Sequence, residues 1–313
     1  MQAVKWMRII GFILHGKIRG RKAVKASLIE RFQPNFTVRI YETTRPREAE
    51  PLALQALQEG CDYLVAVGGD GTLNEVVNGY LKYEGPDRDR VILGLLPFGT
   101  GNDFARGVGI RRDLGQFEEL INKSVPVKLD AGALRFRKKD GSIFVRYFDN
   151  IADLGLGADV VARVNGVHLR KKIMGGTLTF FLSVIITFMT FRHKNVRITW
   201  DGFSWEGPVL SLVVANGRYF GSGFGIAPEA RMDDGLFEVV ILGKLSILDY
   251  LKNYMKLRRS EKIDHPEVFY HRACKLFVEE EKAIIIVEAD GELEGHAPLE
   301  FECLPGVLNF LVP

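Results

Sequence analysis

Cysteines, histidines and long apolar runs are scarce in this chain, and each scarcity excludes a class of protein. The three cysteines, Cys61, Cys274 and Cys303, are far apart and odd in number, so we expect reduced thiols in a cytoplasmic protein and no disulfide framework. The six histidines form neither an HExxH motif nor a paired cluster, which argues against a His/Cys zinc site. The run Ile9–Leu14 is too short for a signal peptide, and no run reaches the roughly 20 apolar residues of a spanning helix.

The chain also lacks an excess of charge of one sign. Among its 313 residues, 42 Lys and Arg stand against 39 Asp and Glu, for a formal net charge of +3. Proteins that bind nucleic acid usually carry a larger basic excess, so we expect no nucleic-acid partner. Hydrophobic residues make up 47% of the chain, which excludes a disordered protein, and the length suits two domains of roughly 130–180 residues.

The first part of the chain alternates strand and helix patterns. Its strands are nearly continuous apolar runs, which is typical of a doubly wound, mostly parallel α/β sheet with helices on both faces. In such sheets, ligands bind beyond the carboxyl ends of the strands. The expected strands are Met7–Leu14, Phe36–Tyr41, Tyr63–Val67 and Val91–Leu96, and the expected helices are Arg21–Phe32, Ala49–Leu57 and Leu73–Leu81.

From about Val127 onward the pattern becomes rich in short strands, which indicates an antiparallel sandwich or partial barrel. We place the boundary at Pro126, giving an α/β domain over 1–126, joined by the tail 304–313, and a β-rich domain over 127–303. Helices are expected at about Asp159–Arg192 and Ile247–Arg258. The expected strands are Ala133–Phe136, Ile143–Phe148, Val196–Trp200, Val209–Ala215, Phe237–Leu242, Lys275–Val278 and Ala283–Glu288.

The most apolar stretch, Leu178–Phe191, is expected to be a buried helix. The alternative is a helix that contacts a membrane surface, because Arg170, Lys171 and Lys172 precede it and basic residues beside an apolar helix favour anionic lipid.

The sharpest motif is Gly68-Gly69-Asp70-Gly71-Thr72, which follows an apolar strand and opens a helix. Glycines let backbone N–H groups approach a polyanion, and the helix N-terminus adds a positive dipole end. No Lys-Ser/Thr follows, so this is not a Walker A loop. Asp70 would repel phosphate unless Mg²⁺ lay between them, and we therefore assign it to a metal–nucleotide site. The alternative is an ordinary strand–turn–helix corner with Asp70 as a helix cap.

A second strand–loop–helix corner, Pro97–Arg106, contains Gly99 and Thr100 and again offers small residues and a hydroxyl. Two such corners can face one crevice of a sheet, which favours a nucleotide.

Two acidic segments complete the motifs. Asp290-Gly291-Glu292 is first of all a hairpin-turn signal, but its carboxylates follow an apolar strand and could act as a general base. The doublet of Asp233 and Asp234 needs a cation or hydrogen-bond donors to offset its repulsion, and a solvated turn is the alternative to a metal site.

Together these motifs resemble the catalytic domain of the diacylglycerol kinase family, which is related to the sphingosine and ceramide kinases, and in particular its soluble bacterial branch. Gly68–Glu75 is similar to the family's Gly-Gly-Asp-Gly-Thr-x-Asn-Glu, and Leu96–Ala105 to its Leu-Pro-x-Gly-Thr-x-Asn-Asp-Phe-Ala. After the first strand the chain departs from the family's Asn-Pro-x-Ser-Gly and has His15-Gly16-Lys17. Further matches, in the family's order, are Asn150–Gly157, Asn216–Gly225, Pro228–Leu236, Asp290–Glu292 and Leu304–Pro313.

The resemblance implies an ATP- and Mg²⁺-dependent kinase that phosphorylates the hydroxyl of a lipid alcohol, in a cleft between an ATP-binding domain and a lipid-substrate domain. It implies that Asp290 or Glu292 acts on the acceptor hydroxyl, Asp290 being preferred, and that Asp70 is catalytic. It further implies a structural Mg²⁺ site at Arg231, Asp234 and Leu236, with Arg231 and Leu236 acting through their carbonyls. The ATP contacts implied are Thr43 or Thr44, Gly68, Gly69, Asp70, Gly71, Thr72, Leu73, Asn74, Glu75, Gly99 and Thr100.

Such a protein would sit in the cytoplasm, at the inner surface of the membrane, and could form a homodimer. One alternative is a soluble-substrate kinase of the NAD kinase or phosphofructokinase type, which shares Gly-Gly-Asp-Gly. The other is a lipid- or nucleotide-binding protein with little turnover, which the altered loop after the first strand suggests.

Overall fold

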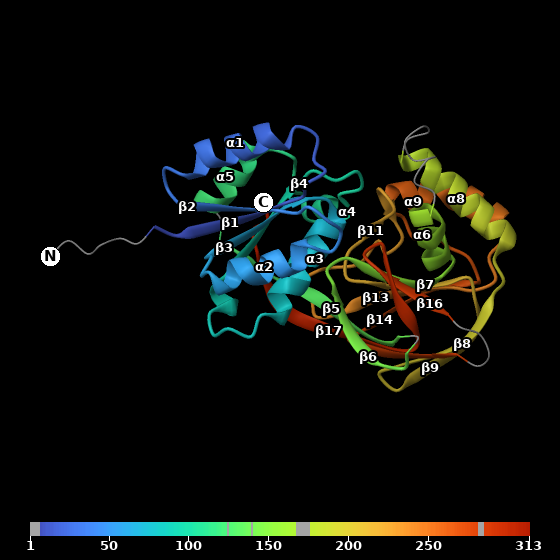
Figure 1. Cartoon of the computed structure of the whole chain (residues 1–313). Coiled ribbons are helices and arrows are strands. Elements are labelled where there is room, and N and C mark those ends of the chain that lie inside the picture. Colours follow the sequence, from blue (N-terminus) through green and yellow to red (C-terminus); the bar gives the residue numbers. More distant parts are fainter. Residues whose placement is uncertain (1–6, 124, 139, 167–175, 281–284) are drawn as a thin grey trace. The chain divides into compact units, whose positions relative to one another are not determined.

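A computed structural model describes residues 7–123, 125–138, 140–166, 176–280 and 285–313. The chain divides into two compact units (Figure 1). Unit 1 comprises residues 1–129 and 307–313, and unit 2 comprises residues 130–306. The boundary expected at Pro126 lies just before the long strand that begins at Val127.

Unit 1 is built on a parallel sheet with the strand order β2–β1–β3–β4. At the β4 edge, Phe310 pairs in parallel with Leu93, so the end of the chain joins this sheet. This is the doubly wound class that the sequence predicts. The elements are β1 (Ile9–Leu14), α1 (Arg21–Phe32), β2 (Thr37–Glu42), α2 (Ala49–Gln58), β3 (Tyr63–Gly68), α3 (Asp70–Lys82), η1 (Arg88–Arg90), β4 (Ile92–Pro97), α4 (Asp103–Val108) and α5 (Leu114–Lys123).

The apolar strands are buried on both faces because helices cover each side of the sheet (Figure 1). Helices α1 and α5 cover one face, where Phe12 of β1 packs against Phe32 and Phe117 with ring centroids 5.5 and 6.4 Å away. Helices α2 and α3 pack against each other on the opposite face. Burying each such ring contributes about 1.5–3 kcal/mol, so the carboxyl ends of the strands sit on a rigid base.

Unit 2 is a β-rich domain of antiparallel strands. One path runs β14–β13–β10–β7–β16–β17, and β17 also pairs with β15, which continues to β8 and β9. The strands are β5 (Val127–Arg137), β6 (Ile143–Phe148), β7 (Ile151–Gly155), β8 (Lys194–Trp200), β9 (Phe203–Val209), β10 (Ser211–Ala215), β11 (Tyr219–Phe220), β12 (Phe224–Gly225), β13 (Phe237–Leu242), β14 (Val268–Ala273), β15 (Lys275–Glu280), β16 (Ile286–Ala289) and β17 (Glu292–Phe310).

The helices of unit 2 lie together on one side of its sheets (Figure 1). They are α6 (Leu156–Gly166), α8 (Gly176–Thr190) and α9 (Ile247–Arg259). The helical region expected at about 159–192 is confirmed for the described residues, where it comprises α6 and α8. The basic residues Arg170, Lys171 and Lys172 lie outside the described residues, as do Ala283 and its neighbour 284 of the predicted strand 283–288.

Helix α8 is buried on one side only. Val184 and Thr187 are buried, whereas Met189 is 78% exposed, so the expected buried helix is confirmed for part of its surface. Within the described ranges, every helix is too short or too polar to span a bilayer.

Candidate functional site

The first glycine corner joins β3 to α3 through a single residue, Gly69. The Thr72 and Leu73 N–H groups both donate to the Gly69 carbonyl, at 3.0 and 3.1 Å, and start α3. A Cβ on Gly68 would lie 2.4 Å from Thr72 Oγ1, so a side chain there would displace the first turn of the helix. The three glycines of this motif therefore have different roles, and Gly68 is needed for packing.

The two glycine corners touch each other. A Cβ on Gly69 would lie 2.9 Å from the Gly99 Cα, and a Cβ on Gly99 would lie 2.4 Å from the Gly69 Cα. Both positions follow the ends of adjacent parallel strands, β3 and β4. The backbones of the two loops thus pack without any intervening side chain, as expected for two corners at one edge of a sheet.

Asp70 connects the same two corners. Its Oδ1 accepts a hydrogen bond of 3.2 Å from the Phe104 N–H, at the start of α4. The residue is half-buried and is the first residue of α3, with Gly69 in the cap position and no side-chain cap bond. Its carboxylate therefore bonds to the neighbouring loop while the residue itself stands in the first turn of α3.

Gly71 differs from the other two glycines because nothing requires it. It lies in the first turn of α3, is exposed, and a Cβ built on it would meet no atom within 4 Å. A helical glycine with open space around it contributes neither a special backbone angle nor close packing, and it lowers helix stability by roughly 0.5–1 kcal/mol relative to alanine. Gly71 therefore leaves the backbone open at the positive end of the 13-residue helix α3, and its assignment to ATP remains a prediction.

The second corner is held by its own side chains. The Gly99 N–H donates to Asn102 Oδ1 and the Asn102 Nδ2 donates to the Gly99 carbonyl, both at 2.9 Å. Asn102 has a φ of 51°, the left-handed conformation that asparagine tolerates best after glycine. Thr100 is exposed at the tip. The sequence predictions missed Asn102, although asparagine after a Gly-Thr-Gly turn could have indicated this brace.

The threonines after β2 lie beside the loop that follows β1. The Gly16 N–H donates to Thr43 Oγ1 at 3.0 Å, and a Cβ on Gly16 would lie 1.9 Å from the Thr43 carbonyl oxygen. Thr44 instead donates through its hydroxyl to Glu48 Oε2 at 2.9 Å. Thr43 therefore contacts the loop after β1, whereas Thr44 bonds to Glu48, which directly precedes α2.

The loop after β1 keeps cations at its surface. Lys17 and Arg19 are exposed, and the Arg21 Nη1 donates to the Gly16 carbonyl at 2.8 Å. Burial, followed by the charge of Lys17, lowers the pKa of His15, so this imidazole is neutral near pH 7. The positive charge of the loop is thus supplied by lysine and arginine side chains.

Three predicted contacts lie inside α3. Leu73 and Asn74 are each 1% exposed, and Asn74 accepts a hydrogen bond of 3.2 Å from Asn78 Nδ2. Glu75 Oε2 accepts a 2.7 Å hydrogen bond from the Ala49 N–H and so satisfies the N-terminus of α2. These side chains fix the position of α3, and their assignment to ATP remains a prediction.

In unit 2, Asp290 and Gly291 form the two-residue turn of the β16–β17 hairpin. Their φ angles are 49° and 87°, and Ala289 pairs with Glu292 across the turn, as the Asp-Gly signal predicts. The Asp290 carboxylate accepts N–H groups from three successive residues, Asp149 at 2.9 Å, Asn150 at 3.2 Å and Ile151 at 2.9 Å. Three donors stabilise its charged form. Glu292 is exposed.

Two further carboxyl groups are buried directly beneath this turn. Asp153 of β7 and Glu288 of β16 are paired across the antiparallel strands and are 2% and 4% exposed. Burial raises the pKa of Asp153 to about 7, and burial together with Asp153 raises the pKa of Glu288. Glu288 Oε2 also accepts the Gly291 N–H at 2.7 Å, so it braces the turn that carries Asp290. The sequence predictions missed this pair.

The acidic doublet is neutralised by arginines. Asp233 Oδ1 accepts from Arg231 Nε at 3.1 Å, and Asp234 forms an ion pair with Arg272. Asp234 Oδ1 also accepts the Leu236 N–H at 3.1 Å. The described residues contain no group of three or more His, Cys, Asp or Glu side chains suited to a metal. The Arg272 guanidinium pairs with the Asp234 carboxylate in this structure, and the structural Mg²⁺ site at Arg231, Asp234 and Leu236 remains a prediction.

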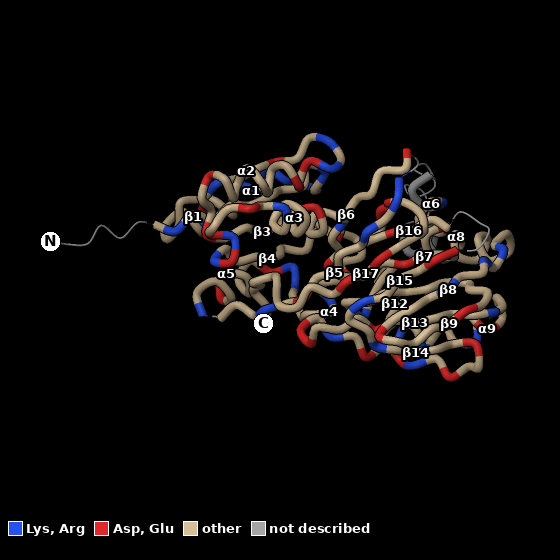
Figure 2. The backbone as a smooth tube through the Cα atoms, turned by 90° about the horizontal axis from the view of Figure 1, so that it is seen from below, with Lys and Arg blue, Asp and Glu red and all other residues tan. Residues whose placement is uncertain are grey.

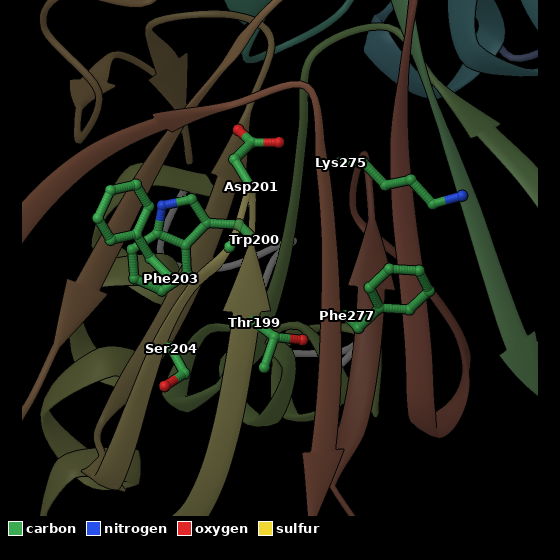
Figure 3. Close-up of a pocket in the computed structure, with 8 residues that line it drawn as sticks. Thr199, Trp200, Asp201, Phe203, Ser204, Lys275 and Phe277 are labelled. Atoms are coloured by element: carbon green, nitrogen blue, oxygen red, sulfur yellow. The ribbon is translucent and has the colours of Figure 1, made fainter.

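A surface cavity of about 430 Å³ lies elsewhere in unit 2, at the β8–β9 hairpin (Figure 3). Trp200 and Phe203 stand on one side, and Lys275 and Phe277 of β15 stand on the other. It contains none of the predicted site residues. Figure 2 shows basic and acidic residues interspersed over the described parts of both units, in agreement with the near-balanced charge.

The fold and the paired glycine corners define a class: an α/β unit with two glycine corners at the carboxyl edge of its parallel sheet, followed by a β-rich unit. Residues 12–134 match the diacylglycerol kinase catalytic domain, and residues 151–312 match the YegS C-terminal NAD kinase beta sandwich-like domain. The chain belongs to the diacylglycerol kinase family, in its soluble bacterial branch.

Relatives match nearly the whole chain, and solved structures share its fold. The chain is 28% identical to the diacylglycerol kinase of Bacillus subtilis, covering 96% of this chain and 95% of the relative. It is 32% identical to a protein named "Probable lipid kinase YegS-like" from Pseudomonas aeruginosa, covering 96% and 93%. A solved diacylglycerol kinase from Bacillus anthracis shares the fold, with a TM-score of 0.70 at 19% identity and 99% and 98% coverage. Yeast NADH kinase gives a TM-score of 0.52 at 12% identity, covering 98% and 83%.

Proposed function

We propose that this protein is a kinase that transfers the γ-phosphoryl group of ATP to the hydroxyl of a lipid alcohol such as diacylglycerol. The observation that carries the proposal is the pair of glycine corners in a chain of this family. Gly69 and Gly99 bring two loops into backbone contact, and Gly71 leaves the first turn of α3 open.

Unit 1 is suited to bind the triphosphate. The exposed backbone at Gly71 lies at the N-terminus of α3, where N–H groups and the helix dipole attract anions. Lys17 and Arg19 add exposed cations from the loop after β1. Thr100, exposed at the tip of the second corner, supplies a hydroxyl. Phosphoryl transfer needs little covalent chemistry from the protein, so positioning and charge compensation of this kind are most of what is required.

Asp70 fits a role beside the phosphates. Its Oδ1 is fixed by the Phe104 N–H, and a carboxylate at this point is compatible with a polyanion when a divalent cation accompanies the nucleotide. Bound Mg²⁺ would neutralise charge that develops on the phosphoryl oxygens. We therefore assign two roles to Asp70: it binds magnesium–ATP, and its bond to Phe104 holds the two glycine corners together.

In unit 2, Asp290 is our first candidate for the residue that receives the acceptor's proton, with Glu292 as the alternative. The three backbone donors keep Asp290 charged and fixed in orientation. A strong base is unnecessary here, because the hydroxyl loses its proton readily only as the new phosphorus–oxygen bond forms in a loose transition state. The carboxylate therefore serves mainly to orient the hydroxyl.

A lipid acceptor is supported by the names of the relatives, which include diacylglycerol kinase and lipid kinase. A lipid alcohol resides in a bilayer, so the enzyme would act from the cytoplasm at a membrane surface. The resemblance of unit 2 to NAD kinase sandwiches keeps a soluble acceptor as the competing reading.

The test is phosphoryl transfer from γ-labelled ATP to a panel of acceptors. The panel contains diacylglycerol, monoacylglycerol, ceramide and sphingosine in detergent micelles, together with NAD and fructose 6-phosphate in solution. Labelled lipid product supports the proposal. Label on NAD or the sugar phosphate alone rejects it in favour of a soluble-substrate kinase, and ATP binding without any transfer indicates a binding protein.

A further inference from the structure

Helix α9 presents an apolar stripe to solvent. Leu248, Leu251 and Met255 are 62%, 45% and 55% exposed. They are three and four residues apart and so share one face of the helix. The opposite face is the packed one, where Tyr250, Tyr254 and Leu257 join the core of unit 2. The stripe is therefore the solvent-facing side of a helix whose other side packs in the core of unit 2.

The same face is basic. Lys252 and Arg259 follow Leu248 and Met255 at a spacing of four residues and are exposed. Helix α9 contains four basic residues and one acidic residue, Asp249, whose carboxylate is held in the capping box with Ser246. Its exposed surface thus combines apolar side chains with positive charge, and its one carboxylate, Asp249, is 24% exposed and bonded to Ser246.

Helix α8 continues the apolar character beside α9. The two helices are in contact, with the rings of Phe188 and Tyr250 5.8 Å apart (Figure 1). The outer surface of α8 leaves Ile186 38% exposed and Met189 78% exposed. Five of the large exposed apolar side chains thus come from two adjacent helices, whereas isolated exposed apolar residues would need no explanation.

We propose that the exposed face of α9 (Leu248, Leu251, Lys252, Met255 and Arg259) docks unit 2 on a bilayer that contains anionic lipids. This inference rests on the proposed function, because a lipid acceptor requires an interfacial enzyme. Apolar side chains would enter the headgroup boundary while the cations pair with lipid phosphates, as in amphipathic helices that lie in a membrane interface.

The charge of the face distinguishes a bilayer from a second copy of the chain. In a two-fold symmetric dimer, a face meets its own equivalent, so Lys252 and Arg259 would lie against the partner's basic face. Like charges at such a contact are unfavourable, whereas an anionic lipid surface complements them.

The experiment is flotation of the full chain with vesicles of phosphatidylcholine containing phosphatidylglycerol, compared with vesicles of phosphatidylcholine alone. Wild-type protein should float with the anionic vesicles. The variants L248S/M255S and K252E/R259E should each weaken that binding at least about tenfold, because burial of apolar area and attraction to anionic lipid both contribute.

Matched controls carry the same changes elsewhere. I143S/F203S replaces two apolar residues that are 70% and 67% exposed, and K123E/R137E lowers the net charge by the same amount. Both controls should float like the wild type. If the α9 variants, shown to be folded by their melting temperatures, bind vesicles as the controls do, the docking face is wrong. A shift from dimer to monomer in the α9 variants by ultracentrifugation, with vesicle binding unchanged, would assign the face to a second copy.

The outcome is separable from the proposed function. The wild-type protein is assayed in parallel for phosphoryl transfer to diacylglycerol in detergent micelles. Transfer without α9-dependent flotation overturns the docking face alone, and α9-dependent flotation without lipid phosphorylation overturns the kinase proposal alone.

Discussion

The substitution Gly71→Ala separates nucleotide binding from folding. A Cβ on Gly71 meets no atom within 4 Å, and the residue lies in a helix, so alanine should fold as well as glycine or better. Replacing a helical glycine by alanine raises the free energy of unfolding by roughly 0.5–1 kcal/mol. In the ATP complex, the new methyl group would occupy the space where the phosphates approach the backbone, and we expect ATP affinity to fall at least about tenfold, or ~1.4 kcal/mol.

Gly99→Ala is the matched comparison. Its Cβ would lie 2.4 Å from the Gly69 Cα, well inside the roughly 3.5–4.0 Å of a normal carbon contact, and 2.7 Å from Asn102 Oδ1. Both neighbours are fixed, so the two corners must separate. We expect a loss of about 1–3 kcal/mol of stability together with the loss of ATP binding.

Thermal and denaturant unfolding give the stability, and isothermal titration gives the ATP dissociation constant. We expect Gly71→Ala to lower ATP affinity without loss of stability, and Gly99→Ala to lower both. Wild-type ATP affinity in Gly71→Ala would show that the open space at α3 is not a phosphate site.

Three further substitutions test other parts of the account. Glu75→Ala removes the acceptor for the Ala49 N–H, so we expect the free energy of unfolding to fall by about 1 kcal/mol. A larger change in the free energy of ATP binding than in that of unfolding would instead indicate direct contact between Glu75 and ATP. Because the folded-state pKa of Asp153 is raised to about 7, stability conferred at low pH is lost as the pH rises from about 4 to about 7. In Asp153→Asn, the free energy of unfolding should fall by roughly 2–4 kcal/mol less than in the wild type between about pH 4 and pH 7. The same dependence of unfolding free energy on pH in the wild type and the variant would contradict this. Asp290→Asn keeps an acceptor for the N–H groups of Asp149 and Ile151 and should stay folded, with turnover lowered at least about 100-fold. Asp290→Ala should lose about 2–4 kcal/mol of stability as well. Unchanged turnover in the asparagine variant would assign the proton-accepting role to Glu292.

The sequence was sufficient to predict the α/β unit and its glycine corners because their signals are local. Nearly continuous apolar strands and period-3.6 helices mark β3 and α3, and glycines mark each turn. Parallel strands place both corners at one edge, so the approach of Gly69 to Gly99 follows from the topology. The two-residue turn of the β16–β17 hairpin could also be predicted, because Asp290-Gly291 is a typical turn sequence.

Interactions between distant segments could not be predicted in this way. The pairing of Asp153 with Glu288 depends on β7 lying beside β16, and no local pattern reports which strands pair. The same holds for the ion pair of Arg272 with Asp234, which joins two segments distant in the sequence. Strand β9 escaped prediction because its side chains are mostly exposed or half-buried and include glycine and proline.

The most direct test of the central claim is the fate of the γ-phosphoryl group when the protein is mixed with labelled ATP, Mg²⁺ and diacylglycerol. We expect one equivalent of phosphorylated lipid for each ADP formed, and at least about 100-fold less product with Asp70→Asn. Absence of lipid product from folded wild-type protein across the acceptor panel, or equal turnover by Asp70→Asn, would contradict it.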